Sequence, residues 1–143
     1  MLGKCLGKGE IMNFEDEKDY IMRIIKQLFR VLFSLLLGKK YVQVELPLEN
    51  KYEVSGDRLS RLKEMIDNGE INEAENMLLD KIDYTNREDV EEALFFYEYT
   101  SGKGSTFLEK HNYSQEEVLD GLKGLAAGAG YGEIADMLAG DPL

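Results

Sequence analysis

The sequence has few of the residues from which many functional sites are built. Among its 143 residues there are one cysteine (Cys5), one histidine, no tryptophan and only two prolines. A single cysteine excludes an intrachain disulfide framework, a CxxC redox motif and a zinc-ligand spacing. Scarce proline favours long helices, whose interiors reject it. We therefore expect a helical protein without a metal or other cofactor.

The charge is strongly acidic and unevenly distributed. The net charge is −11; residues 1–40 carry eight Lys/Arg against five Asp/Glu, whereas residues 41–143 carry nine against 23. An acidic body repels phosphate backbones, so nucleic acid is an unfavoured partner. The low cysteine content, together with an N-terminal segment that lacks the apolar run of a signal peptide, indicates a cytoplasmic protein.

Length and composition predict one globular domain, since 43% of the residues are hydrophobic and 31% are charged. Residues 1–12 are rich in glycine and lysine without a period, and we interpret them as a disordered leader. Met12 is an alternative start, directly before a clear helix. The helical domain then covers residues 13–139, and residues 140–143 form a tail that should fray.

The first helix is expected over residues 14–37. Asn13 is its predicted N-cap, and Gly38 its stop. Its apolar stripe widens after Leu28 until it covers most of the helix, which indicates burial on several sides or docking. Core packing and a two-fold dimer are the favoured alternatives, and a membrane surface is the minority one. The central contacts of a dimer would be Ile25, Phe29, Leu32, Phe33 and Leu36.

The segment Tyr41–Leu46 alternates in polarity. We favour an extended connector there, with a short edge strand or dimer-paired strand as the alternative. After it, periodic apolar patterns predict helices over residues 57–68 and 71–82, joined by so short a turn at Gly69 that they must lie side by side.

Further helices follow, with capping boxes at Thr85/Glu88 and Ser114/Glu117. The expected fold is all-α, with five to seven helices as stacked antiparallel hairpins and one long N-terminal helix.

Four aromatic residues stand close together in the helix after Thr85: Phe95, Phe96, Tyr97 and Tyr99. Helical geometry spreads these rings around much of the cylinder, so one inward stripe cannot hold them all. Core packing is the favoured interpretation. A binding groove is the alternative, because tyrosine and phenylalanine anchor many interfaces.

Two glycine-rich segments invite a nucleotide-binding interpretation that their surroundings oppose. Gly102-Lys103-Gly104 lacks the upstream glycine and the preceding strand of a phosphate loop. Gly128, Gly130 and Gly132 follow a helix, whereas a dinucleotide turn follows a strand. We interpret both segments as connectors.

The single histidine, His111, lies in a polar turn without the partners that catalysis requires. The many carboxylates are interpreted as solvated helix faces and caps. An enzyme built from His111 and scattered carboxylates remains the third alternative, but the sequence favours a protein without catalytic activity.

Two resemblances add to this reading. The run Gly69-Glu70-Ile71-Asn72-Glu73-Ala74 resembles the turn of a single tetratricopeptide hairpin. Over most of residues 13–138, the chain is similar to an uncharacterised bacterial family of short helical proteins. That similarity rests on the helix Asp19–Phe33, the run Asn72–Asn76, Phe96-Tyr97 and the run His111–Glu117. It implies a helical fold and no activity.

The sequence therefore predicts a non-catalytic, tetratricopeptide-like helical module for protein–protein interaction, self-associating as a homodimer through residues 14–37 or binding another protein. The alternative is a peripheral membrane protein anchored by the same amphipathic helix. The solution mass and flotation with anionic liposomes distinguish the two.

Overall fold

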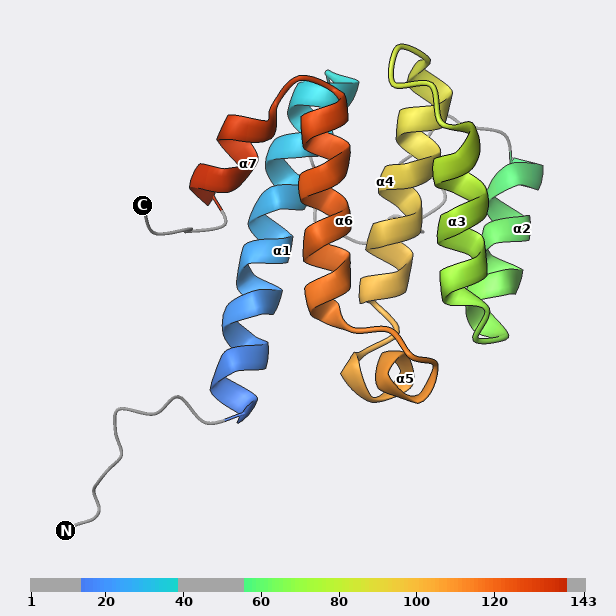
Figure 1. Cartoon of the computed structure of the whole chain (residues 1–143), viewed down its shortest axis with the longest axis vertical. Coiled ribbons are helices and arrows are strands. Elements are labelled where there is room, and N and C mark those ends of the chain that lie inside the picture. Colours follow the sequence, from blue (N-terminus) through green and yellow to red (C-terminus); the bar gives the residue numbers. More distant parts are fainter. Residues whose placement is uncertain (1–13, 39–55, 139–143) are drawn as a thin grey trace, which may run out of the picture.

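The computed structural model describes residues 14–38 and 56–138, and every regular element in those ranges is an α-helix (Figure 1). The helices are α1 (Phe14–Leu37), α2 (Gly56–Asp67), α3 (Ile71–Lys81), α4 (Arg87–Ser101), α5 (Ser105–Lys110), α6 (Gln115–Gly128) and α7 (Gly132–Leu138). The expected leader, the alternating segment Tyr41–Leu46 and the expected tail lie outside the described residues.

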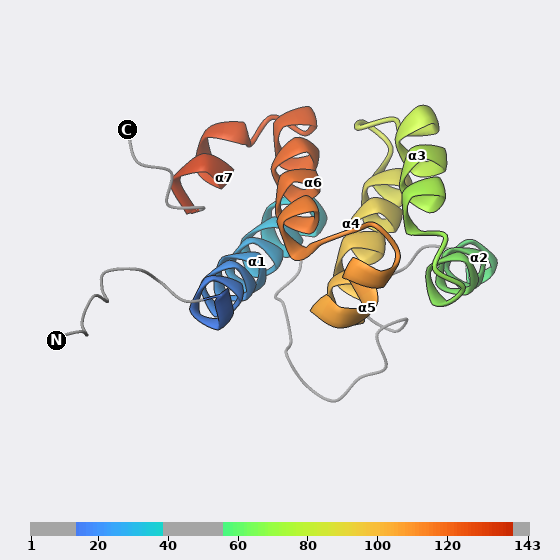
Figure 2. The same cartoon turned by 60° about the horizontal axis from the view of Figure 1, so that its bottom comes forward.

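The helices pack around α4, which contacts α1, α2, α3 and α6. From α2 to α4, and again through α6 and α7, successive long helices run in opposite directions (Figures 1 and 2). The long helix α1 lies beside α6 and points the same way as α6, and it also contacts α4 and α7. The all-α class is confirmed, while a repeated tetratricopeptide-like stack is not established by this arrangement.

The first helix has the bounds that its sequence predicts. It ends as Gly38 takes a positive φ of 67°, a conformation that glycine adopts without steric cost, and the Gly38 N–H donates to the Ser34 carbonyl over 2.9 Å.

The α2–α3 turn is built on Gly69, whose φ is +85°. The Gly69 N–H donates to the carbonyl of Ile66, and the Glu70 N–H donates to that of Met65, both over 2.9 Å. This pair of bonds is a Schellman motif, which closes the end of α2 and reverses the chain within two residues. The predicted side-by-side hairpin is therefore confirmed.

The predicted cap of α4 is wrong by one residue. Asn86 rather than Thr85 is the N-cap, and its side-chain oxygen accepts from the N–H groups of Glu88 and Asp89 over 2.9 and 3.2 Å. Thr85 instead donates its hydroxyl to Asp83 over 2.6 Å. The predicted cap of α6 is confirmed, because Ser114 Oγ accepts from the N–H of Glu117 over 3.2 Å.

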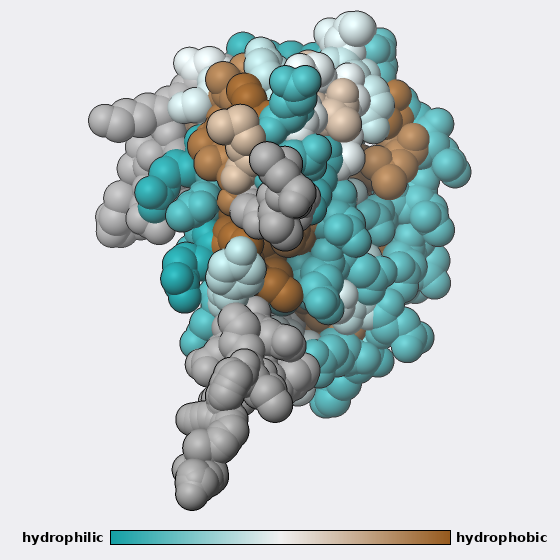
Figure 3. Space-filling model, turned by 60° about the vertical axis from the view of Figure 1, so that its left-hand side comes forward, coloured by the Kyte–Doolittle hydropathy of each residue, from teal (hydrophilic) through white to brown (hydrophobic). Residues whose placement is uncertain are grey.

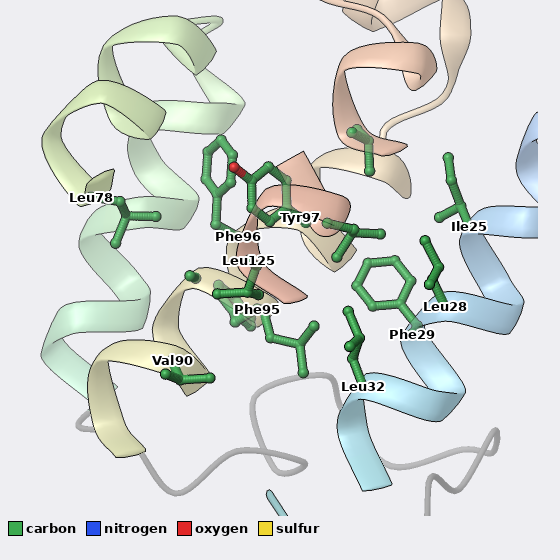
Figure 4. Packing of buried hydrophobic residues seen from close by; sticks show 14 of the residues in the cluster. Ile25, Leu28, Phe29, Leu32, Leu78, Val90, Phe95, Phe96, Tyr97 and Leu125 are labelled. Carbon is green, nitrogen blue, oxygen red and sulfur yellow. The ribbon is translucent and has the colours of Figure 1, made fainter. Parts of the chain in front are cut away.

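The hydrophobic core runs through the whole helix bundle. Figure 4 shows α1 side chains, among them Ile25, Phe29 and Leu32, directed toward residues of the neighbouring helices. Buried residues of α2 and α3 close the core on the far side of α4, among them Leu62, Ile66 and Leu78.

Candidate functional site

The five α1 residues expected at a dimer interface belong to the protein's own core. Ile25, Phe29, Leu32 and Phe33 are at most 5% exposed, and Leu36 is partly buried against the core. The apolar stripe of α1 therefore serves core packing within one chain. Any surface that α1 offers to a partner must be its outer side.

The aromatic cluster of α4 also lies mainly in the core. Phe95, Phe96 and Tyr97 are buried, and Tyr99 is half-buried. All of these rings can be covered because α4 has neighbours on several sides. Phe95 and Phe96 are fully buried, whereas Tyr97 is among the residues that line a groove.

The hydroxyl of Tyr97 ends at a carboxylate on the neighbouring helix α3. It donates to Glu75 Oε2 over 2.6 Å. Burial raises the pKa of Tyr97 well above its ordinary value, and the nearby charge of Glu75 raises it further. Within the part of the chain that the structure describes, the buried hydroxyl of Tyr113 has no hydrogen-bond partner of good geometry, yet burial and then the charge of Glu75 raise its pKa as well. Both tyrosines are thus held neutral beside one carboxylate.

The Glu75 carboxylate lies in a groove of about 390 Å³ between α3 and α6. The helix α4 lies between them in Figures 1 and 2, and its Tyr97 helps to line the groove. The other lining residues are Glu75, Leu79, Tyr84, Glu117, Asp120, Gly121, Gly124 and Leu125. The groove is therefore aromatic and apolar inside, with three carboxylates on it.

Three glycines of α6 determine the shape of this groove. A Cβ at Gly121 would lie closer than 3.0 Å to the Tyr97 ring, and a Cβ at Gly128 closer than 3.0 Å to the Tyr84 ring. A Cβ at Gly124 would meet no atom within 4 Å. Each ring thus lies against the helix backbone where a side chain is missing, and open space remains between them.

The Gly102-Lys103-Gly104 segment is an ion-paired connection. Lys103 Nζ donates to Asp67 Oδ1 over 2.8 Å and lies 4.8 Å from the ring centre of Phe107 and 5.5 Å from that of Tyr99. The Lys103 hydrogen bond, together with that of the Tyr99 hydroxyl, holds the pKa of Asp67 below its ordinary value. Lys103 therefore ties α4 to the end of α2, a role that agrees with a connector.

His111 has a packing role in this structure. Its ring is half-buried, 4.6 Å from that of Phe107 between centres, and lies against Gly69 of the α2–α3 turn. Across the same contact, Asn72 Nδ2 donates to the Asn112 carbonyl over 3.1 Å. The histidine thus joins two turns.

The glycines after α6 terminate that helix, as predicted. Gly130 has a φ of +96°, its N–H donates to Ala127, and the N–H of Tyr131 donates to the Ala126 carbonyl over 2.7 Å. This is a second Schellman motif. It turns the chain into α7.

Several carboxylates gather around one arginine. Arg58 of α2 pairs with Glu88, Asp89 and Glu92 of α4. The bond to Asp89 is 3.0 Å long. Within the described residues, no group of three His, Cys, Asp or Glu side chains is placed to hold a metal ion. The cluster therefore connects α2 with α4.

Sequence reasoning missed Glu75, Tyr84 and Asp120 as groove residues. They come from α3, from the loop after it and from α6, so only the fold brings them together. One signal was present: Gly121, Gly124 and Gly128 recur at the spacing of one helix face. Glycine at such a spacing inside a helix indicates close approach of another group.

The molecule is thus an all-helical bundle with an acidic, tyrosine-lined groove between α3 and α6. The chain belongs to a family of unknown function (DUF6483), whose model matches residues 15–130. This confirms the resemblance to an uncharacterised helical family; the tetratricopeptide similarity is not shown. No curated protein and no solved structure matches the chain.

Proposed function

We propose that this protein is a non-catalytic helical module that binds proteins and associates with a second copy of itself through the α1–α7 side. One observation carries the proposal: apolar side chains are exposed there. Leu35 of α1 is 39% exposed, and Ile134 and Met137 of α7 are 38% and 78% exposed. Figure 3 shows apolar residues gathered on this side. Exposed apolar area of this kind marks many protein contacts.

Charge favours a contact through α1 over one through the later, more acidic helices. Two copies with a net charge of −11 repel each other, and most of their acidic residues follow residue 40. The outer side of α1 exposes Arg23, Lys26 and Arg30 beside Asp19. A contact through this mixed surface adds less repulsion than one through the acidic helices. The proposal includes a cytoplasmic location, in keeping with the single cysteine.

Light scattering of the full chain over a range of concentrations tests self-association. We expect a mass of twice the 16.3 kDa of one chain. The double variant Leu35→Glu/Met137→Glu should be monomeric and folded. The control Leu79→Glu changes a residue of similar exposure (42%) on α3 and should stay dimeric. A monomeric parent chain, or a double variant that stays dimeric, contradicts this proposal.

Little of α1 is available for contact with a membrane surface, which was the alternative to self-association. No helix in the described ranges is long and apolar enough to cross a membrane. The apolar face of α1 is packed in the core, so only the outer residues, such as Tyr20 and the three basic residues, are available to a bilayer surface. A monomer that floats with anionic vesicles and is released by salt supports this alternative.

A further inference from the structure

The groove between α3 and α6 contains an open slot between two tyrosine rings. The rings of Tyr97 and Tyr84 occupy the space over Gly121 and Gly128, one at each end. The position over Gly124, between those two glycines on the same helix face, is open. The slot therefore has the exposed ring of Tyr84 at one end, the buried ring of Tyr97 at the other and a glycine backbone as its floor.

Negative charge surrounds this slot. Glu75, Glu117 and Asp120 line the groove, and among its described lining residues there is no lysine or arginine. The Tyr97 hydroxyl donates to Glu75 and so holds that carboxylate at the groove. A concave site with several carboxylates and low-dielectric walls concentrates cations.

We propose that this groove binds the cationic side chain of an arginine or lysine presented by a partner protein. Tyr84 is 37% exposed, and the face of an aromatic ring attracts such cations. Carboxylates accept their N–H groups in charge-assisted hydrogen bonds. Leu79 and Leu125 of the groove wall would contact the aliphatic stem of the side chain. A volume of about 390 Å³ exceeds the needs of one such side chain and leaves room for adjacent backbone.

This inference does not depend on self-association. The groove lies between α3 and α6, whereas the proposed self-contact uses α1 and α7 on the opposite side of α6 (Figure 1). A protein that proves monomeric would still present the groove, and a dimer without cation binding would leave the first proposal intact. The two proposals can therefore fail separately.

The test is a titration of the full ¹⁵N-labelled chain, followed by amide chemical shifts. The probes are N-acetyl-arginine amide and N-acetyl-lysine amide, and N-acetyl-norleucine amide is the uncharged control of similar shape. We expect saturable shifts with the two cationic probes, centred on the amides of Gly121, Gly124 and Gly128. Equal shifts with the norleucine probe, or shifts spread over the acidic surface, would overturn the inference.

A blocking variant separates the slot from general acidity. Gly124→Leu places a side chain in the open space, and leucine is a good helix former, so the fold should be retained. Binding of the arginine probe should weaken at least about fivefold once the space between the rings is filled. A folded Gly124→Leu chain that binds the probe as tightly as the parent contradicts the inference.

Two charge variants on α6 compare the loss of a carboxylate inside the groove with the loss of one outside it. Asp120→Asn removes a carboxylate of the groove and should weaken binding about threefold, as expected for one partly screened charge pair. Glu116→Gln removes the same charge from an exposed residue of α6 outside the groove and should change binding less than about twofold. Equal effects of the two variants would show that net charge alone attracts the probe and would reject the site.

Discussion

The imidazole ring of His111 lies directly against the backbone of Gly69, in the space that a side chain at residue 69 would occupy. The two residues belong to turns far apart in the sequence, one between α2 and α3 and the other between α5 and α6. The bond from Asn72 to the Asn112 carbonyl joins the same two turns. This contact fixes the lower end of the α2–α3 hairpin against the rest of the bundle (Figure 1).

Gly69→Ala should destabilise the protein by about 2–3 kcal/mol, because a Cβ there meets both a left-handed backbone and the His111 ring. Gly130→Ala is the matched control, since Gly130 has a φ of +96° but open space around it. Gly130→Ala should lower the free energy of unfolding by only about 1 kcal/mol, which is the cost of the left-handed backbone alone. Urea denaturation measures the free energy of unfolding of both variants. Equal losses of stability would show that the His111 ring moves aside freely.

Gly121→Ala and Gly124→Ala should change stability in opposite directions. A methyl group at Gly121 collides with the buried ring of Tyr97, whereas one at Gly124 enters open space. Alanine in a helix interior is favoured over glycine by about 0.5–1 kcal/mol, so Gly124→Ala should stabilise the chain by that amount. Gly121→Ala should destabilise it by about 1–3 kcal/mol. Thermal unfolding of both variants checks the signs, and a stabilising Gly121→Ala contradicts the packing described.

Removal of two neighbouring hydroxyl groups should have unequal effects. Tyr97→Phe loses the 2.6 Å bond to Glu75 and should lower the free energy of unfolding by about 1.5–3 kcal/mol, typical of a hydrogen bond to a charged group. Tyr113→Phe removes a buried hydroxyl that has no good partner among the described residues, and its effect on stability should be neutral or favourable. Denaturant titrations of the two variants decide this, and a large loss for Tyr113→Phe would reveal a partner for its hydroxyl.

The ion pair between Asp67 and Lys103 should make the free energy of unfolding depend on pH in the acidic range. The folded-state pKa of Asp67 lies below the ordinary value of 3.8, with Lys103 as the main cause. Ionised Asp67 therefore stabilises the fold above the unfolded-state pKa, and this contribution is lost as the pH falls through the folded-state pKa.

The pair is partly exposed, so we expect Asp67→Asn to cost less than about 1 kcal/mol at neutral pH. The difference in unfolding free energy between parent and variant should be constant above about pH 5 and should shrink below pH ~3.8. In a Lys103→Met background, Asp67→Asn should cost less and show a weaker pH dependence. A difference that grows as the pH falls would contradict the assigned direction.

The sequence predicted the elements whose signals are local. The periodic stripe of α1, the Gly69 turn and the Ser114 cap depend on residues within a few positions of one another, and these were found correctly. The choice between Thr85 and Asn86 failed because both are good capping residues and only the path of the chain selects one.

The burial of the α4 rings was the favoured prediction, whereas the groove could not be predicted because it arises from contacts between distant segments. The pair of Tyr97 and Glu75 is separated by 22 positions, and the neighbours that cover Phe95 and Phe96 come from other helices. A single sequence fixes which residues are apolar, but it does not say how many neighbours each helix will have. For the same reason, the sequence left open whether Phe29 and Phe33 pack in the core or at a dimer interface. The structure buries both side chains within one chain.

The placement of α1 beside α6 has a consequence for synthesis. The helix α1 is made before α6 and α7, two of the helices that contact it. Until α6 is made, the apolar stripe of α1 is only partly covered in the nascent chain, and exposed apolar surface of this kind promotes aggregation and binding by chaperones. Closure of the bundle requires α6 and therefore depends on a contact between two helices that are far apart in the sequence.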